Sequence, residues 1–206
     1  MARPRFFQSR SSNLLRVYKL SLLACTAILI TWFSWSCRDV YYFTHYDKSF
    51  PKKIWQILHY SLDEKPGFVD DYQAQWKSVN SRYEHECLTE GTEDSFVRDK
   101  FRYDSGIRQT YDLIKSDPIL RADFLRYLIL LAEGGVYTDV DTRPIRPVDD
   151  WIPSQYRNRT NVVLGIEIDK GQGPLWSGMP WSIQISQFTI MAKRNHPLIR
   201  RVVHDV

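Results

Sequence analysis

Two aspartates separated by one residue are the candidates for metal chemistry in this chain. Asp139 and Asp141 follow a short apolar stretch, and residues two apart in a strand share a face, so Tyr137 lies on the same side. Neighbouring carboxylates repel each other unless a cation lies between them. Such oxygen ligands suit Mg²⁺ or Mn²⁺, which bind through one or two carboxylates together with substrate phosphates. The pair therefore predicts a nucleoside-diphosphate site, with a solvated turn as the alternative.

A helix expected over 121–133 must position this pair. It carries Asp123, Arg126 and Tyr127 at i, i+3 and i+4, which places them on one side. A guanidinium suits phosphate because it offers a planar fork of donors. We expect the three side chains to face one ligand. The alternative for Asp123 and Arg126 is an ion pair within the helix.

Two glycines, Gly134 and Gly135, end this helix. A left-handed helix stop explains at least one of them. Close approach of a nucleotide to the backbone is a hypothesis for the other.

Three sequence blocks resemble those of glycosyltransferase family 32, the "DXD sugar-binding" group. The block 122–142, which holds the aspartate pair, looks like the family's core motif, and Phe50–Gln56 looks like its first strand. Gln187–Ala192, with His196 and Pro197, is similar to the fungal Golgi branch, the initiation-specific alpha-1,6-mannosyltransferases. The three blocks occur in the family's order.

This resemblance implies an α/β fold of the GT-A type, a Rossmann-like nucleotide-sugar domain. It implies that Asp139 and Asp141 bind Mn²⁺ (or Mg²⁺), and that the donor is GDP-mannose. The product would be an alpha-linked mannose on a glycan acceptor, formed with retention. Asp123 and Arg126 match positions that hold the donor's sugar and phosphate, and Tyr127 belongs to the same block.

Other residues carry weaker expectations. Trp55 and Tyr137 are candidates for contact with the donor, with core packing as the alternative for both. The family's first strand often has a second Trp where this chain has Leu58. Glu167 and Asp169 alternate onto one side of a strand, and the fungal resemblance makes them candidate catalytic residues that orient the acceptor hydroxyl. A solvated strand end is the alternative.

His196 stands directly before Pro197 and looks like part of the fungal signature. Because His196 immediately precedes a predicted helix, we favour a purely structural role for it at the start of that helix.

Composition sets broad limits. The chain has 206 residues, 43% of them hydrophobic, and a net charge of +4. This length suits one domain with a substantial core. No basic patch interleaved with aromatics indicates nucleic-acid binding.

An apolar stretch over 17–37 follows several arginines and is long enough to cross a bilayer. We expect a cytosolic tail (1–16), a transmembrane signal-anchor (17–37), a stem (38–49) and a catalytic domain (50–206). The positive-inside rule predicts a single-pass type II membrane protein with a lumenal catalytic domain. The resemblance implies a Golgi location and a mannosyltransferase complex as a candidate partner. A cleaved signal peptide is the alternative.

Three cysteines, Cys25, Cys37 and Cys87, form no disulfide framework, and a Cys37–Cys87 bridge stays open. Asn158 begins an Asn-Arg-Thr glycosylation sequon, usable in the secretory pathway.

Hydrophobic spacing predicts alternating strands and helices, typical of an α/β sheet that binds ligands at strand ends. The expected strands are 54–58, 83–88 and 161–169. The expected helices are 68–79 (with Phe68, Tyr72, Trp76 and Val79 in the core), 93–101, 106–116, 183–191 and one from Pro197 (with Leu198, Ile199, Val202 and Val203 inward).

Members of the family generally continue beyond the position that matches Val206, so we expect a catalytic domain that is incomplete at the C-terminus.

Two other functions are alternatives to a glycoprotein mannosyltransferase. One is an inositol phosphoceramide mannosyltransferase, and the other is a truncated, non-catalytic, membrane-anchored paralogue.

Overall fold

The computed structural model describes residues 24–31, 49–59, 65–174 and 181–206. Two compact units are present, 1–44 and 45–206, and residues 24–31 of the first are helical. Among the described residues, no helix combines the length and apolarity needed to cross a membrane. Most of the expected anchor and stem, and Cys37 with them, lie outside the described residues.

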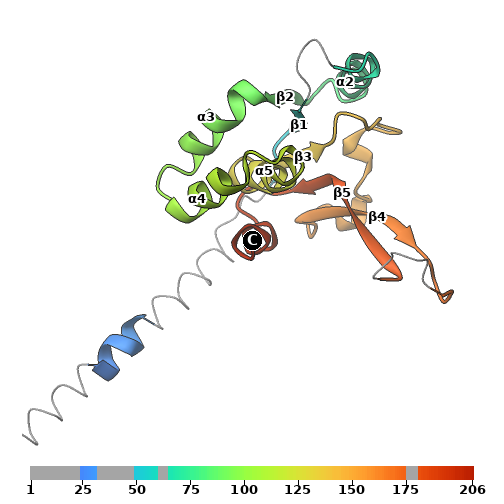
Figure 1. The fold of residues 1–206 in the computed structure, drawn as a ribbon. Helices are drawn as coiled ribbons and strands as arrows, with labels where there is room; N and C mark the ends of the chain where they lie inside the picture. The colour runs from blue at the N-terminus through green and yellow to red at the C-terminus, as the bar shows by residue number, and fades with distance from the viewer. Residues whose placement is uncertain (1–23, 32–48, 60–64, 175–180) are drawn as a thin grey trace, which may run out of the picture. The chain divides into compact units, whose positions relative to one another are not determined.

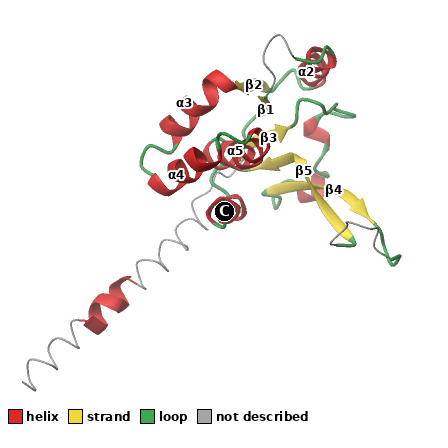
Figure 2. Ribbon diagram, viewed as in Figure 1, coloured by secondary structure: helices red, strands yellow, loops and turns green. Residues whose placement is uncertain are grey.

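The second unit is built on a five-stranded mixed sheet with the order β2-β1-β3-β5-β4 (Figures 1 and 2). Its strands are β1 (Lys53–Leu58), β2 (Glu84–Thr89), β3 (Gly135–Thr138), β4 (Val162–Asp169) and β5 (Ile183–Ala192). The first three run parallel, whereas β5 is antiparallel to both β3 and β4. The α/β prediction is confirmed, and β4 is an edge strand.

Helices cover both faces of this sheet. Strand residues alternate between two core clusters, so that Trp55 and Tyr137 face one side while Ile54 and Val136 face the other. The first side packs against α3 (Glu90–Lys100), α4 (Ser105–Ile114), α5 (Pro118–Ala132) and α6 (Pro197–His204). The second packs against α2 (Phe68–Val79) and the 3-10 turn Val148–Asp150.

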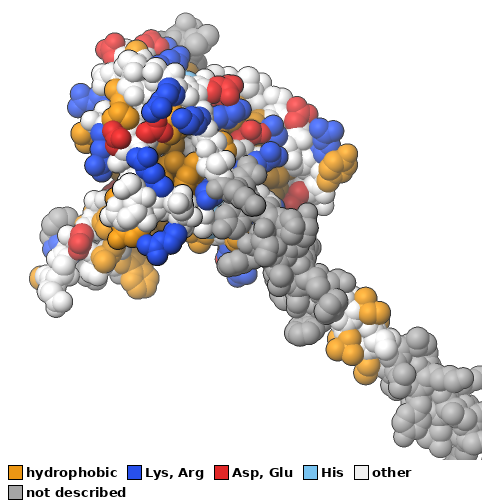
Figure 3. Space-filling model, turned by 180° about the vertical axis from the view of Figure 1, so that it is seen from behind, with side chains coloured by type: hydrophobic (Ala, Val, Ile, Leu, Met, Phe, Trp, Pro, Cys, Tyr) orange, Lys and Arg blue, Asp and Glu red, His pale blue; other side chains and the backbone are white. Residues whose placement is uncertain are grey.

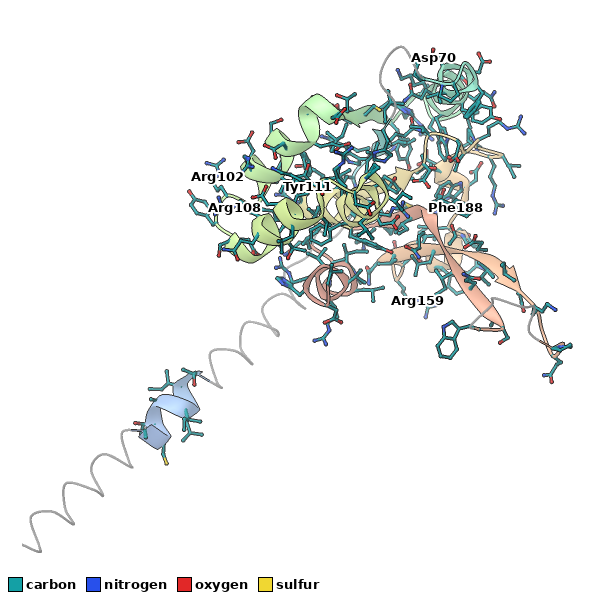
Figure 4. All side chains as sticks on the ribbon, in the orientation of Figure 1. Asp70, Arg102, Arg108, Tyr111, Arg159 and Phe188 are labelled. Atoms are coloured by element: carbon teal, nitrogen blue, oxygen red, sulfur yellow. The ribbon has the colours of Figure 1, made fainter. Side chains whose placement is uncertain are left out.

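The helical layer has a buried inner side and a solvated outer end. Tyr111 on α4 is buried among the helices, whereas Arg102 and Arg108 lie toward the outer end of α3 and α4 (Figure 4). Positive and negative side chains are interspersed on the face shown in Figure 3. Asn158 is exposed in a turn, as a glycosylation acceptor requires, and Cys87 is a free thiol.

Helix α5 has defined ends. The Asp117 side chain accepts hydrogen bonds from the backbone N–H groups of Ile119 and Leu120, with Pro118 in the first turn. At the other end, Gly134 and Gly135 have φ of 66° and 95°.

Both glycines are required by neighbouring backbone. A Cβ on Gly134 would lie 2.5 Å from the backbone nitrogen of Arg194, and one on Gly135 would lie 2.6 Å from the backbone carbonyl oxygen of Lys53. The hypothesis that a nucleotide approaches the second glycine is therefore wrong, because strand β1 takes that space.

The predicted helix over 183–191 is also wrong, because this segment is strand β5. It lies between β3 and β4 and hydrogen-bonds to both. Its β-branched and aromatic residues suit a pleated surface. Ile190 and Met191 are buried on opposite faces of the sheet, and Ile190–Ala192 therefore form an apolar run without alternation at the end of the strand.

Two helices bury fewer of the predicted residues than expected. In α2, Trp76 and Val69 are buried, whereas Phe68 and Val79 are exposed and Tyr72 is half-buried. The Trp76 indole donates to the Thr142 carbonyl at 3.1 Å. In α6, Ile199 and Val203 are buried, Val202 is half-buried and Leu198 is exposed.

Candidate active site

A cavity of about 270 Å³ lies where β1 and β3 end and α5 begins. Four predicted site residues line it together: Asp123 and Arg126 from α5, and Asp139 and Asp141 from the segment after β3. Its other lining residues are Ile57, His59, Pro118, Ile119, Ala122 and Val140. The carboxyl ends of parallel strands are the usual ligand position in α/β folds.

Asp139 is fixed by hydrogen bonds to two neighbours, Phe188 and Tyr137. Its backbone N–H donates to the Phe188 carbonyl of β5 at 2.9 Å, so β5 extends the pairing one residue beyond β3. Its Oδ1 accepts a hydrogen bond from the Tyr137 hydroxyl at 2.5 Å. Tyr137 itself is buried beneath the cavity and acts by holding this carboxylate rather than by lining the surface.

Asp141 lies in a turn, not on the strand face predicted for it. The turn is closed by the Thr142 hydroxyl, which donates to the Asp139 carbonyl at 2.6 Å. Asp141 is exposed and still lines the same cavity as Asp139. A turn thus achieves the convergence that strand alternation was expected to give.

Arg126 is 8% exposed and lies near the carboxylates of Asp123 and Asp139. Its Nη2 lies 2.7 Å from Oδ1 of Asp123 and 3.7 Å from Oδ1 of Asp139. Its guanidinium also lies over the Tyr137 ring, 5.4 Å from the centroid. The predicted ion pair within the helix is present, and the same arginine faces the cavity.

The electrostatics of Asp139 favour a bound cation. Burial raises the pKa of this carboxyl, the Tyr137 hydrogen bond and Arg126 lower it, and Asp141 and Asp123 raise it; the net direction is upward. The negative charge of an ionised Asp139 is therefore only partly balanced by its neighbours in the folded protein. A cation placed against the carboxylates would stabilise that charge.

The donor set fits Mg²⁺ or Mn²⁺ only with help from a ligand. Tyr137 and Arg126 both contact Oδ1 of Asp139, and no hydrogen bond to its Oδ2 is present among the described residues. No group of three or more His, Cys, Asp or Glu side chains in the described ranges is arranged to hold a metal alone. Two carboxylates completed by phosphate oxygens are a normal Mg²⁺ environment.

Residues 66–158, which include this cavity's acidic residues, match the family described as "Glycosyltransferase sugar-binding region containing DXD motif". This segment is therefore similar to that glycosyltransferase family, and Asp139-Val140-Asp141 has the spacing of a DXD motif.

Relatives with related names match most of this chain. The initiation-specific alpha-1,6-mannosyltransferase of Candida albicans is 38% identical over 173 residues, 78% of this chain and 44% of the relative. The enzyme of that name from Schizosaccharomyces pombe is 34% identical over 174 residues, covering 82% and 43%. The one from Saccharomyces cerevisiae is 29% identical over 188 residues, covering 76% and 39%. The chain thus spans less than half the length of these curated relatives.

One solved structure, PaToxG glycosyltransferase, aligns with 85% of this chain and 66% of its own chain. The sequence identity is 18% and the TM-score is 0.48.

Trp55 and Tyr127 do not line the DXD cavity. Trp55 is 5% exposed and packs edge-on against Phe96 in the core, as its packing interpretation predicts. The Tyr127 hydroxyl points to β5 and lies 3.5 Å from Oε1 of Gln187. The structure therefore does not support either residue as a surface for the donor.

Glu167 and Asp169 do not line the DXD cavity, so the structure does not bring them together with the DXD pair. Both are exposed on β4, and Asp169 pairs with Ile183. Thr189, the partner of Thr138 beside the cavity, is six positions farther along β5, roughly 20 Å at strand spacing. Asp169 instead accepts the Gly171 N–H at 2.9 Å and stabilises the loop after β4.

His196 has the expected structural role, because its Nδ1 accepts the Leu198 N–H at the start of α6.

Sequence reasoning missed two residues at the DXD site, His59 and Gln56. His59 follows β1 and lines the cavity, and the buried Gln56 amide lies 3.4 Å from the Asp139 carbonyl. The signal that could have found them is topological. If β1 and β3 are parallel neighbours, polar residues at the end of β1 must lie beside the DXD pair.

Proposed function

We propose that this protein is a metal-dependent glycosyltransferase that moves mannose from GDP-mannose to a glycan acceptor. The carrying observation is the convergence of Asp123, Arg126, Asp139 and Asp141 on one cavity at the ends of β1 and β3. The names of the three relatives support mannose as the sugar. The mixed α/β sheet, with its cavity at strand ends, supports a GT-A nucleotide-sugar domain.

Each cavity residue has a chemical role in this proposal. Asp139 and Asp141 would hold Mn²⁺ or Mg²⁺, which supplies positive charge for the leaving diphosphate. Arg126, buried and pre-oriented by Asp123, offers its remaining N–H donors to a phosphate. Asp123, which is half-exposed, accepts a hydroxyl of the donor sugar.

The proposed transfer retains the alpha configuration, because an alpha donor gives an alpha product. Catalysis then depends on stabilising the leaving group and on positioning the acceptor. The proposed acceptor is a glycoprotein glycan in the Golgi lumen, with the protein anchored by its N-terminal apolar segment. The exposed sequon at Asn158 supports a secretory location.

The test is calorimetric titration of the full chain with GDP-mannose, with Mn²⁺ and with EDTA. Asp141→Asn preserves shape at an exposed turn and removes one metal-binding charge. We expect it to weaken Mn²⁺-dependent binding about 100-fold, which is ~2.7 kcal/mol. Asp99→Asn, at an exposed site on α3, is the matched control and should bind like the native chain.

Binding that is lost with EDTA and with Asp141→Asn supports the proposal and leads to transfer assays on mannose oligosaccharides. Binding that persists unchanged in either condition contradicts the metal role. Absence of binding by the folded native chain contradicts GDP-mannose as the donor.

A further inference from the structure

A fully buried glutamate lies behind the DXD cavity. Glu93 of α3 is 1% exposed, and its Oε2 lies 3.0 Å from Nε of Arg121 on α5. Its Oε1 lies 3.8 Å from Nδ1 of His59, the residue that follows β1 and lines the cavity. Burying a carboxylate is costly unless it is well paired. Arg121 forms an ion pair with one oxygen, without a hydrogen bond between the two atoms, and His59 is the polar group that faces the other oxygen.

The two nitrogens of His59 have different surroundings. Nδ1 is buried and has no hydrogen-bond partner, and neither does the Glu93 oxygen that faces it. Nε2 is not among these buried atoms, and the His59 side chain is 26% exposed. Nε2 is therefore the nitrogen that a molecule in the cavity reaches. The 3.8 Å separation exceeds a hydrogen bond, and a ring movement of about 1 Å would close it.

The surroundings of His59 favour a neutral ring. Burial lowers its pKa, Arg121 and Arg126 lower it further, and Asp123 raises it. A neutral imidazole carries one N–H and one lone pair. With the N–H on Nδ1, toward the Glu93 carboxylate, the lone pair lies on Nε2, toward the cavity.

A lone pair on Nε2 can accept a hydrogen bond only from those groups of a sugar nucleotide that carry a donor hydrogen. Ionised phosphate oxygens are acceptors only, so they cannot bond to it. A sugar hydroxyl can donate to it. A shared metal site is not supported, because His59 and the acidic residues form no three-ligand group in the described part of the chain.

We propose that His59 is a further donor-binding residue whose Nε2 accepts a hydroxyl of the donor sugar, and that Glu93 is the positioning residue that keeps the N–H on Nδ1. This inference rests on the proposed function, because it concerns the same donor cavity. It adds a contact to the donor sugar from the end of β1, in the same cavity as Asp123 and the metal-binding pair.

Two substitutions at His59 separate its nitrogens. Gln places its terminal amide near the Nε2 position, whereas Asn reaches only the Nδ1 position. With Mn²⁺ present, His59→Asn should weaken GDP-mannose binding about five- to tenfold, the value of one hydrogen bond. His59→Gln should retain most of the affinity. Neither variant should change the affinity for GDP, which has no sugar at that place.

Glu93→Gln tests the positioning role. It keeps the side chain's shape and removes its charge, and near-ultraviolet circular dichroism checks that the variant is folded. We expect about two- to fivefold weaker GDP-mannose binding, unchanged GDP binding, and a shift of the His59 proton from Nδ1 to Nε2 in ¹⁵N spectra. Glu90→Gln, at an exposed site on the same helix, should change none of these.

Selective loss of GDP-mannose affinity in His59→Asn supports the inference. Equal loss for GDP-mannose and GDP, or no loss, overturns it. The proposed function stays intact in that case if Asp141→Asn still weakens Mn²⁺-dependent GDP-mannose binding as expected. A native chain that binds neither nucleotide overturns both proposals. An Nε2–H tautomer in the native chain overturns the role of Glu93.

Discussion

The chain contains two acidic pairs with the same spacing near strand ends, and the fold treats them differently. Asp139 and Asp141 follow β3, which lies between β1 and β5, so their surroundings include α5 and its arginine. Glu167 and Asp169 lie on the edge strand β4 and are exposed. The first pair gains a tyrosine, an arginine and a cavity, whereas the second gains one loop contact. Acidic spacing becomes a site only where neighbours from other elements converge.

The ribbon of β4 and β5 differs from the cavity in a second respect. Its outer part exposes apolar side chains, namely Ile166 of β4, Ile183 and Ile185 of β5, and, most of all at 70%, Trp181 just before β5. Figure 1 shows both strands extending away from the helices. The cavity end of the sheet thus buries polar groups, whereas the ribbon exposes apolar ones.

The largest expected effect on this comparison is a steric loss of stability at a glycine of the sheet. Gly135→Ala places a Cβ against the β1 backbone at a φ of 95° and should destabilise the fold by ~3 kcal/mol or more. Gly171→Ala, in the loop after β4, has a φ of 59° with open space and should cost about 1–2 kcal/mol. Urea denaturation measures both. Equal costs would contradict the idea that the β1–β3 part of the sheet is more tightly constrained than the β4–β5 ribbon.

A moderate effect concerns the tyrosine that only the first pair possesses. Metal binding requires an ionised Asp139, so it should be lost as pH falls through that group's raised pKa. Tyr137→Phe removes a hydrogen bond that favours the ionised form, so the midpoint should move to higher pH. At neutral pH we expect at most about fivefold weaker Mn²⁺-dependent GDP-mannose binding. Titration calorimetry across pH gives both values, and a midpoint that moves downward would contradict this account.

The smallest effect is expected on the ribbon. The double variant Glu167→Gln with Asp169→Asn removes both charges and keeps an oxygen for the Gly171 contact. Donor binding should stay within about twofold of the native value, since these residues are remote from the cavity. A large loss in the same calorimetric assay would break the comparison and restore the ribbon pair as site residues.

Much of the fold was predictable because its signals are local. The order of β1, α2, β2, α3, α4, α5 and β3 follows from hydrophobic spacing, from Pro118 at a helix start and from paired glycines at its end. Strand β5 was not predictable in this way. Its last three residues, Ile190–Ala192, are buried on both faces of the sheet, and an apolar run without alternation resembles a buried helix.

The candidate site divides in the same manner. By itself, the sequence determined the DXD pair, the spacing of Asp123 and Arg126 on one helix, and the resemblance to a glycosyltransferase family. Only the tertiary structure placed Trp55 in the core, left Glu167 and Asp169 remote, and brought His59 and Glu93 together. The physical reason is that burial and charge depend on neighbours distant in sequence: Glu93 and Arg121 meet across two helices, and nothing in either segment alone encodes that contact.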